Sequence, residues 1–275
     1  MRFLAIIPVA FLLLRAQDPP PTPPSPPPPP GIAPQLPAVL SNTGKPMTVN
    51  FQCTPDDIQA AGLDCSEHDP CPIYLELNTI ESSGIRIFVA GNIHTTSATL
   101  YSIILGTDDN GHTWREPFER IRGATFDRIQ FSGTDAGWVG GQLVYPLPQD
   151  AFFLQTTDGG KTWRRQDVFN ESRLGALQQF FFEDAKRGSL IIDHGPGSEG
   201  DRYELYESPD GGDSWSIKQT SVKPLAIRRA ASALSSDWRV RADAASKSFH
   251  LEHRDGARWL SVGAFTVNLG ACKPE

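Results

Sequence analysis

The sequence predicts an all-β protein built from repeated four-stranded units, with one short helix near the N-terminus. An octapeptide of the pattern [Ser/Thr]-x-Asp-x-Gly-x-[Thr/Ser]-Trp occurs three times, and its tryptophans are 49 and 52 residues apart. A short apolar or aromatic segment precedes each copy, as expected for a strand. Another apolar segment begins about 25 residues before the second and third tryptophans. Each period therefore has room for four strands.

The recurring positions of the octapeptide suit a tight hairpin turn. The aspartate can accept hydrogen bonds from backbone N–H groups, and the glycine permits a positive φ. The hydroxyl residue can hold the turn, and the tryptophan can bury a large ring between neighbouring sheets. The three copies contain Thr107, Asp109, Gly111, Thr113 and Trp114; Thr156, Asp158, Gly160, Thr162 and Trp163; and Ser208, Asp210, Gly212, Ser214 and Trp215. A degenerate fourth copy, residues 252–259, keeps Gly256 and Trp259.

The length of the repeated region predicts the architecture. Residues 72–262 hold four units of about 48 residues. Four-stranded units at a period of about 40–50 residues are typical of β-propeller blades. We therefore predict a β-propeller-like domain over residues 72–275 with four recognisable blades. A fifth blade, built from residues 44–53 and the strand Phe265–Val267, and an incomplete ring are the alternatives.

The octapeptides resemble the Asp-box, also called the bacterial neuraminidase repeat. This repeat occurs in sialidases and in the exported propellers of the photosystem II stability/assembly factor family. The segment Gly137-Trp138-Val139-Gly140-Gly141, followed by the second octapeptide, is especially similar to the assembly-factor repeat. The resemblance covers about residues 72–262 and implies a role in assembling membrane complexes. Both families usually have more blades than the four that are legible here.

The N-terminal region predicts export. Residues 1–17 combine a basic start, a 12-residue apolar core and a small residue at the cleavage point, as a secretory signal does. Residues 18–43 are proline-rich, because 12 of the 24 prolines lie between Pro19 and Pro37. Such a tract adopts extended polyproline II and predicts a disordered spacer. We expect a periplasmic or extracellular protein with no transmembrane segment after signal cleavage. Peripheral association with the membrane is an alternative.

Residues 44–71 form a segment with a short helix and three of the four cysteines. Thr54 suits the N-cap, Pro55 suits the first helical position, and Gly62 ends the helix. In an exported chain, an even number of cysteines predicts disulfides rather than metal binding.

The four cysteines predict two disulfides, for which three pairings are open. The pairing that we favour is Cys53–Cys65 with Cys71–Cys272, which would brace the helix and tie the C-terminus to the β domain. A zinc site is disfavoured, because structural zinc usually takes four ligands with closely spaced cysteine pairs.

Charge limits the classes of partner. The chain has 25 Lys+Arg against 32 Asp+Glu and a formal net charge of -7. An acidic chain argues against nucleic-acid binding and against docking on anionic lipid. Three loops, residues 92–98, 145–150 and 193–201, are longer than their hairpins need and are candidate binding loops. A candidate basic patch for an acidic protein tail comprises Arg122, Arg128, Arg164, Arg165, Arg228 and Arg229.

The sequence favours a non-enzymatic scaffold or assembly factor that binds a membrane or envelope protein client. A carbohydrate-binding propeller is the alternative, and a sialidase-like glycoside hydrolase is a remote one. The aromatic-Arg-Ile-Pro motif of sialidases is absent. Tyr203 and Glu204 are adjacent on a strand, so they point to opposite faces and do not form the tyrosine–glutamate pair of those enzymes. We therefore expect no catalytic residue, no metal site and no cofactor.

Overall fold

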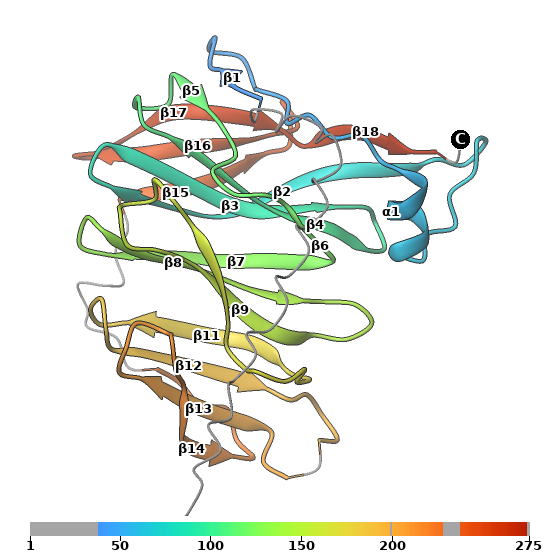
Figure 1. The fold of residues 1–275 in the computed structure, drawn as a ribbon. Coiled ribbons are helices and arrows are strands. Elements are labelled where there is room, and N and C mark those ends of the chain that lie inside the picture. Colours follow the sequence, from blue (N-terminus) through green and yellow to red (C-terminus); the bar gives the residue numbers. More distant parts are fainter. Residues whose placement is uncertain (1–37, 199, 228–236, 274–275) are drawn as a thin grey trace, which may run out of the picture. The chain divides into compact units, whose positions relative to one another are not determined.

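The computed structural model describes residues 38–198, 200–227 and 237–273, which fold as four antiparallel sheets of three to five strands, a small two-stranded sheet and one short helix (Figure 1). The all-β prediction is therefore confirmed. The predicted signal peptide, residues 1–17, and most of the predicted spacer lie outside these ranges.

Most strands follow one another as simple up-and-down hairpins. Sheet 1 has the order β18–β2–β3–β4–β6 and contains β2 (Cys71–Ser83), β3 (Arg86–His94), β4 (Thr99–Thr107), β6 (Ile121–Arg122) and β18 (Asn268–Cys272). Sheet 2 contains β7 (Ala124–Ser132), β8 (Ala136–Leu143), β9 (Gln149–Thr156) and β10 (Arg164–Asp167). Sheet 3 contains β11 (Ala176–Phe182), β12 (Gly188–Asp193), β13 (Tyr203–Ser208) and β14 (Ser216–Ser221). Sheet 4 contains β15 (Trp238–Asp243), β16 (Ser248–Asp255) and β17 (Arg258–Thr266).

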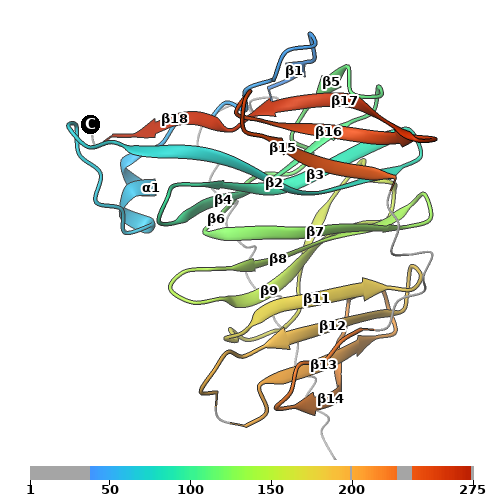
Figure 2. The same cartoon turned by 180° about the vertical axis from the view of Figure 1, so that it is seen from behind.

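The sheets pack face to face in the order 4, 1, 2, 3 (Figures 1 and 2). One core cluster joins Leu251 and Phe265 of sheet 4 to the strands of sheet 1. A second cluster joins sheets 1 and 2, and a third joins sheets 2 and 3. Among the described residues no core cluster joins sheet 3 to sheet 4. The four sheets therefore form an open series within these ranges, which agrees with the incomplete-ring alternative.

The two ends of the described chain interlock sheets 4 and 1. After β17 the chain leaves sheet 4, and β18 pairs with β2 in sheet 1. From the other end, Met47 forms a parallel bridge with Phe265 of β17. Sheet 4 therefore has three strands instead of the predicted four, because the last strand of the chain belongs to sheet 1 and residue 47 lies at its open edge.

The folded part begins inside the predicted spacer. Residues Leu40–Ser41 form β1, which pairs with β5 (Thr113–Trp114), the last two residues of the first octapeptide. The side chain of Asn42 also donates to the carbonyl oxygens of Gly111 and Val262. The last residues of the predicted spacer therefore contact the folded part, and β1 covers the edge of β5 with hydrogen bonds.

Two disulfides are present, as predicted, but the favoured pairing is wrong. Cys53 is bonded to Cys272, and Cys65 is bonded to Cys71. Cys71 and Cys272 are direct neighbours across the β18–β2 ladder, yet Cys272 is taken by Cys53, which immediately precedes α1 (Pro55–Ala60). The chain is therefore covalently anchored before α1, at Cys53, and after α1, at Cys65.

The three octapeptides form the same turn. In the first copy Asp109 Oδ1 accepts the backbone N–H of Thr113 at 2.8 Å, and Oδ2 accepts the Thr113 hydroxyl at 2.6 Å. The Thr107 hydroxyl donates to Asp109 and accepts the N–H of Gly111, whose φ is 86°. Asp158 and Asp210 have the equivalent bonds. At this chain reversal the aspartate carboxylate thus supplies hydrogen bonds that backbone pairing between strands does not provide.

Each octapeptide tryptophan packs between sheets. Trp114 is fully buried and meets Phe265 of sheet 4 edge to face, with ring centroids 5.5 Å apart. Trp163 packs in the same way on Phe88 of sheet 1, and Trp215 packs on Phe153 of sheet 2. These rings give the sheets a repeated apolar contact at one end of the strands.

The degenerate fourth copy does not form this turn. Asp255 pairs directly with Arg258 in a tight hairpin between β16 and β17, with Gly256 at its tip. Trp259 is only partly buried, and the guanidinium of Arg239 lies 4.1 Å from its ring centroid. Without an aspartate and two hydroxyl residues at the recurring positions, the hairpin closes by strand pairing alone.

Acid is expected to weaken the octapeptide turns. Partial burial raises the pKa values of Asp109 and Asp158, but hydrogen bonds from Thr113 and Thr162 outweigh it and lower both to about 2, from an ordinary 3.8. A lowered pKa in the folded state contributes stability that is present above the ordinary pKa and is lost as the pH falls toward the folded-state value. The urea concentration at the denaturation midpoint should therefore decrease as the pH is lowered from about 4 to about 2.

The matched variant is Asp109→Asn/Asp158→Asn. It should be less stable than the wild type at pH 7 and should show a flatter pH dependence in the acid range. Urea denaturation followed by tryptophan fluorescence at several pH values measures both quantities. An unchanged slope in the double variant would contradict this assignment of the acid sensitivity.

Candidate functional site

The three long loops predicted from the sequence lie at the same end of the sheets. They connect β3 to β4, β8 to β9 and β12 to β13, which are equivalent hairpins of successive sheets. In Figures 1 and 2 all three lie on the side that carries α1, and the octapeptide turns lie on the opposite side. We call these two sides the hairpin end and the octapeptide end.

Backbone contacts join the loops of the hairpin end into a continuous surface. The N–H of Gly123 donates to Leu100 O, and the N–H of Val144 donates to Gly123 O. Further along, the N–H of Gly175 donates to Pro148 O. The surface that these bonds hold together extends from sheet 1, across the β8–β9 loop, to the start of sheet 3.

A pocket of about 320 Å³ opens at this end. Its wall is mostly small or apolar. The lining residues are Asp57, Ala60 and Ala61 of α1 and the following residue; Ser97, Ala98, Thr99 and Leu100 of the β3–β4 hairpin; Arg122 and Gly123; and Val144, Tyr145 and Pro146 of the β8–β9 loop. Two of the three predicted loops and one of the predicted arginines therefore meet at the pocket.

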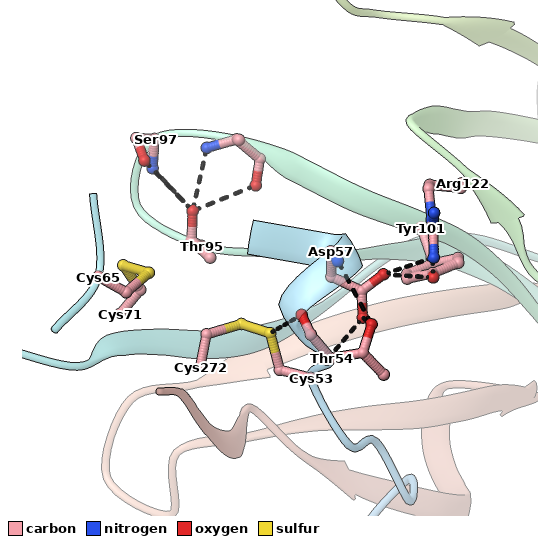
Figure 3. The surroundings of a disulfide bond; sticks show 11 residues. Cys53, Thr54, Asp57, Cys65, Cys71, Thr95, Ser97, Tyr101, Arg122 and Cys272 are labelled. Atoms are coloured by element: carbon pink, nitrogen blue, oxygen red, sulfur yellow. Dashed lines mark hydrogen bonds and ion pairs between the residues drawn. A yellow bond between two sulfur atoms is a disulfide. The ribbon is translucent and has the colours of Figure 1, made fainter. Parts of the chain in front are cut away.

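A buried carboxylate organises the polar side of the pocket (Figure 3). Asp57 is 3% exposed, and its Oδ1 accepts the Tyr101 hydroxyl at 2.5 Å and Arg122 Nη2 at 3.0 Å. Its Oδ2 accepts the backbone N–H and the hydroxyl of Thr54, both at 2.9 Å. Burial raises the pKa of Asp57, but hydrogen bonds from Tyr101 and Thr54 and the charge of Arg122 outweigh it and lower the pKa. Asp57 is therefore ionised at neutral pH.

Arg122 is held in one orientation by this carboxylate. Its Nε donates to the Tyr101 hydroxyl at 3.0 Å, and its side chain is 48% exposed. Among the described residues its Nη1 has no hydrogen-bond partner. A fixed guanidinium with unused N–H groups is a ready donor to a ligand.

Exposed apolar side chains continue from the rim of the pocket. Tyr145 is 60% exposed, Leu147 57% and Leu174 55%. Leu174 lies beside the β8–β9 loop, because it forms a bridge with Gln149. We call Tyr145, Leu147 and Leu174 the apolar strip. Large exposed side chains gathered beside a pocket mark an interaction surface more often than single ones do.

The four described arginines of the predicted basic patch lie at separate places. Arg122 lies at the pocket, whereas Arg128 is in the middle of β7, with its guanidinium 5.9 Å from the Phe180 ring centroid. Arg164 lies 2.6 Å from Asp213, and Arg165 is bonded to Asp167 and stacked on Phe152. The predicted patch residues Arg228 and Arg229 lie outside the described ranges. The described arginines thus serve separate local contacts.

A second polar cluster lies at the hairpin end of sheet 3. Glu204 accepts the Tyr206 hydroxyl at 2.5 Å and Arg173 Nη2 at 2.9 Å, and His194 Nε2 lies 2.9 Å from the same carboxylate. Burial and the hydrogen bond to Glu204 raise the pKa of Tyr206 well above its ordinary value. Tyr206 is 3% exposed, and the raised pKa means that it keeps its proton at neutral pH.

Glu204 pairs with Tyr206 and not with the adjacent Tyr203, and the sequence did not predict this pair. Residues two apart on a strand share a face, and that spacing was the available signal. The pocket residues Asp57, Tyr101 and Tyr145 were also missed as site residues, because their sequence neighbours do not show which side chains converge in space.

The described residues hold no helix that is long and apolar enough to cross a membrane. They also hold no group of three or more His, Cys, Asp or Glu side chains that could bind a metal ion.

Comparisons with known proteins found similarity only to solved structures. No protein-family model matches the chain, and no curated protein matches its sequence. Among solved structures, YCF48 bound to D1 peptide is 15% identical, with a TM-score of 0.39 over 70% of this chain and 56% of that one. YCF48 from Cyanidioschyzon merolae is 19% identical, with a TM-score of 0.36 over 67% of this chain and 55% of that one.

A polysaccharide lyase of family PL25, an ulvan lyase, is 9% identical, with a TM-score of 0.39 over 75% of this chain and 54% of that one. This chain therefore spans little more than half the length of these similar proteins. At such identities and scores the matches carry no argument about function.

Proposed function

We propose that this protein is a non-enzymatic, exported scaffold or assembly factor that binds a membrane or envelope protein client through its hairpin end. The observation that carries the proposal is the meeting of the pocket, the oriented Arg122 and the apolar strip on one continuous surface. Loops held by a rigid sheet scaffold are where binding residues concentrate. The octapeptides, which resemble Asp-boxes, have a structural role at the other end.

Two disulfides support the export part of the proposal, because such bonds persist in oxidising compartments. The resemblance of the octapeptides to those of assembly-factor propellers supports the scaffold part. The two carboxylate oxygens of Asp57 already accept four donors from the protein. The described residues therefore offer no acid–base pair at the pocket.

Client capture is expected to depend on the apolar strip. The oxidised full chain serves as bait for detergent-solubilised host membranes, and captured proteins are quantified by mass spectrometry. Tyr145→Ser/Leu147→Ser should reduce capture of the client about 10-fold or more, because exposed aromatic anchors carry much of an interface's binding energy. Both side chains are largely exposed, so the variant should fold normally.

The matched control is Ile85→Ser. Ile85 is 66% exposed and lies in the β2–β3 turn at the octapeptide end. Its substitution should leave capture unchanged. Equal capture by the wild type and the Tyr145/Leu147 variant would contradict a client site at the hairpin end.

A carbohydrate-binding function is the second candidate, because the exposed ring of Tyr145 at the pocket rim could stack on a sugar. Saturable binding of the purified protein to an immobilised glycan, lost in the Tyr145/Leu147 variant, would favour it over the scaffold proposal.

A further inference from the structure

We propose that the hairpin-end pocket binds an extended apolar peptide segment of the client that is flanked by Lys or Arg, and not an acidic tail. This inference rests on the proposed function and specifies the chemistry of the segment that the site takes. Three properties of the hairpin end lead to it: the charge beside the pocket, the state of Arg122, and the apolar strip.

The segment that supplies one wall of the pocket is acidic. Residues 54–71 contain Asp56, Asp57, Asp64, Glu67 and Asp69 and no Lys or Arg. Four of these carboxylates are exposed, and only Asp57 is paired, with Arg122. The segment supplies part of the pocket wall through Asp57, Ala60 and Ala61. Complementary charge on a partner is therefore positive, and an acidic partner would be repelled.

The pocket itself favours a neutral acceptor. The charge of Arg122 is balanced by ionised Asp57, which lies 3.0 Å from its guanidinium. Its unused N–H groups can still donate a hydrogen bond, and a peptide carbonyl oxygen accepts one without adding negative charge beside Asp57. A ligand carboxylate at Arg122 would instead be repelled by the Asp57 carboxylate, which lies 3.0 Å from the same guanidinium.

The shape and polarity fit an extended segment. A cavity of about 320 Å³ is near the small end of ligand pockets, so it holds a side chain or two and not a whole protein surface. Seven of its twelve lining residues are glycine or apolar, and the other five carry polar side chains. The apolar strip provides further contacts away from α1, and the acidic segment lies on the side of α1. A peptide with an apolar core and a basic flank can therefore contact the apolar strip with its core and the acidic segment with its flank.

The disulfides keep this acidic segment in place. Helix α1 has only six residues and would not be stable alone. Cys53–Cys272 anchors the chain before the helix, and Cys65–Cys71 anchors it after the helix (Figure 3). The charges are therefore presented by a preorganised segment, which reduces the ordering cost of binding.

The test uses the oxidised full chain and three dye-labelled peptides that are blocked at both ends. All have the same Leu-Ala-Pro-Val core, and their flanks are Lys, Gln or Glu. Fluorescence anisotropy should give the tightest binding for the Lys peptide, about 5- to 10-fold weaker binding for the Gln peptide and the weakest for the Glu peptide. The difference should shrink as salt rises from about 0.05 M to about 0.5 M.

Two charge variants locate the effect. Asp64→Asn/Glu67→Gln/Asp69→Asn should remove most of the difference between the Lys and Gln peptides. Asp135→Asn/Asp237→Asn/Asp255→Asn removes the same charge from exposed positions at or near the octapeptide end and should preserve the difference. Tyr145→Ser should weaken binding of all three peptides.

The outcomes separate this inference from the proposed function. If client capture depends on the apolar strip but the Glu peptide binds as well as the Lys peptide, the scaffold proposal stands and the basic-segment inference is overturned. An equal loss in both charge variants also overturns it, since the acidic segment would then have no local role. If no peptide binds below about 1 mM and Tyr145→Ser/Leu147→Ser captures the client normally, both proposals fail.

Discussion

Replacing Cys53 and Cys272 by serine is expected to lower the free energy of unfolding by about 5 kcal/mol. The bond joins residues that are 219 apart in sequence, so it closes nearly the whole folded chain into one loop. A cross-link over so long a loop removes much conformational entropy from the unfolded chain. It also joins the start of α1 to β18, so its loss releases both interlocking ends of the described chain.

The comparison is with Cys65→Ser/Cys71→Ser. This bond spans 6 residues, and its loss should cost about 2 kcal/mol. Guanidinium denaturation without reductant, followed by tryptophan fluorescence, measures both free energies. Equal losses in the two variants would show that loop closure is not the main contribution of the long-range bond.

Gly91→Ala is expected to destabilise the protein by about 4 kcal/mol. A Cβ atom at this position would lie 1.9 Å from Glu76 O and 2.8 Å from Leu77 Cα. Both are backbone atoms of β2, which carries a register shift between Leu77 and Thr79 opposite Gly91. The bulge brings the β2 backbone against β3, so an alanine forces the two central strands of sheet 1 apart.

Gly263→Ala is the matched control within a strand. A Cβ atom there would meet side chains only, with Trp114 Nε1 at 3.3 Å and Met47 Cε at 3.5 Å. Because neighbouring side chains can adjust, the loss should stay below about 1.5 kcal/mol. Thermal unfolding followed by circular dichroism separates the two variants. A Gly91 variant as stable as the Gly263 variant would contradict the close approach of β2.

Local patterns were enough to predict the turns and the helix. Thr54 caps α1, and its hydroxyl accepts the N–H of Asp57 as an N-cap does. The octapeptide turns follow from bonds between residues at most four apart, such as Asp109 to Thr113. Interactions of this range depend on a few neighbouring residues, which sequence displays directly.

The pairing of the cysteines required the tertiary structure. Sequence spacing suggested that Cys53 would reach the nearest cysteine, Cys65. The structure instead places Cys53 beside Cys272, because β18 leaves sheet 4 and pairs with β2. A strand exchange between sheets depends on long-range pairing, for which the local pattern around Cys272 contains no signal.

The candidate site, too, could be predicted only in part from the sequence. The sequence identified the long β3–β4 and β8–β9 loops and included Arg122, because loop length and charge are visible in the chain. It missed Asp57, which appeared to be only an acidic residue in the first turn of a helix. Its burial and its bonds to Tyr101 and Arg122 arise where three separate segments meet.

The sequence by itself determined the all-β class, the period of the repeat, the octapeptide turns and the presence of two disulfides, since these depend on residue type and spacing. Only the tertiary structure decided the order of sheet packing, the exchange of β18 into sheet 1, the cysteine partners and the meeting of Arg122 with a buried carboxylate. The physical reason is range. Turns and caps gain their free energy within a few residues, whereas sheet packing and the pocket gain theirs from contacts between residues far apart in the chain.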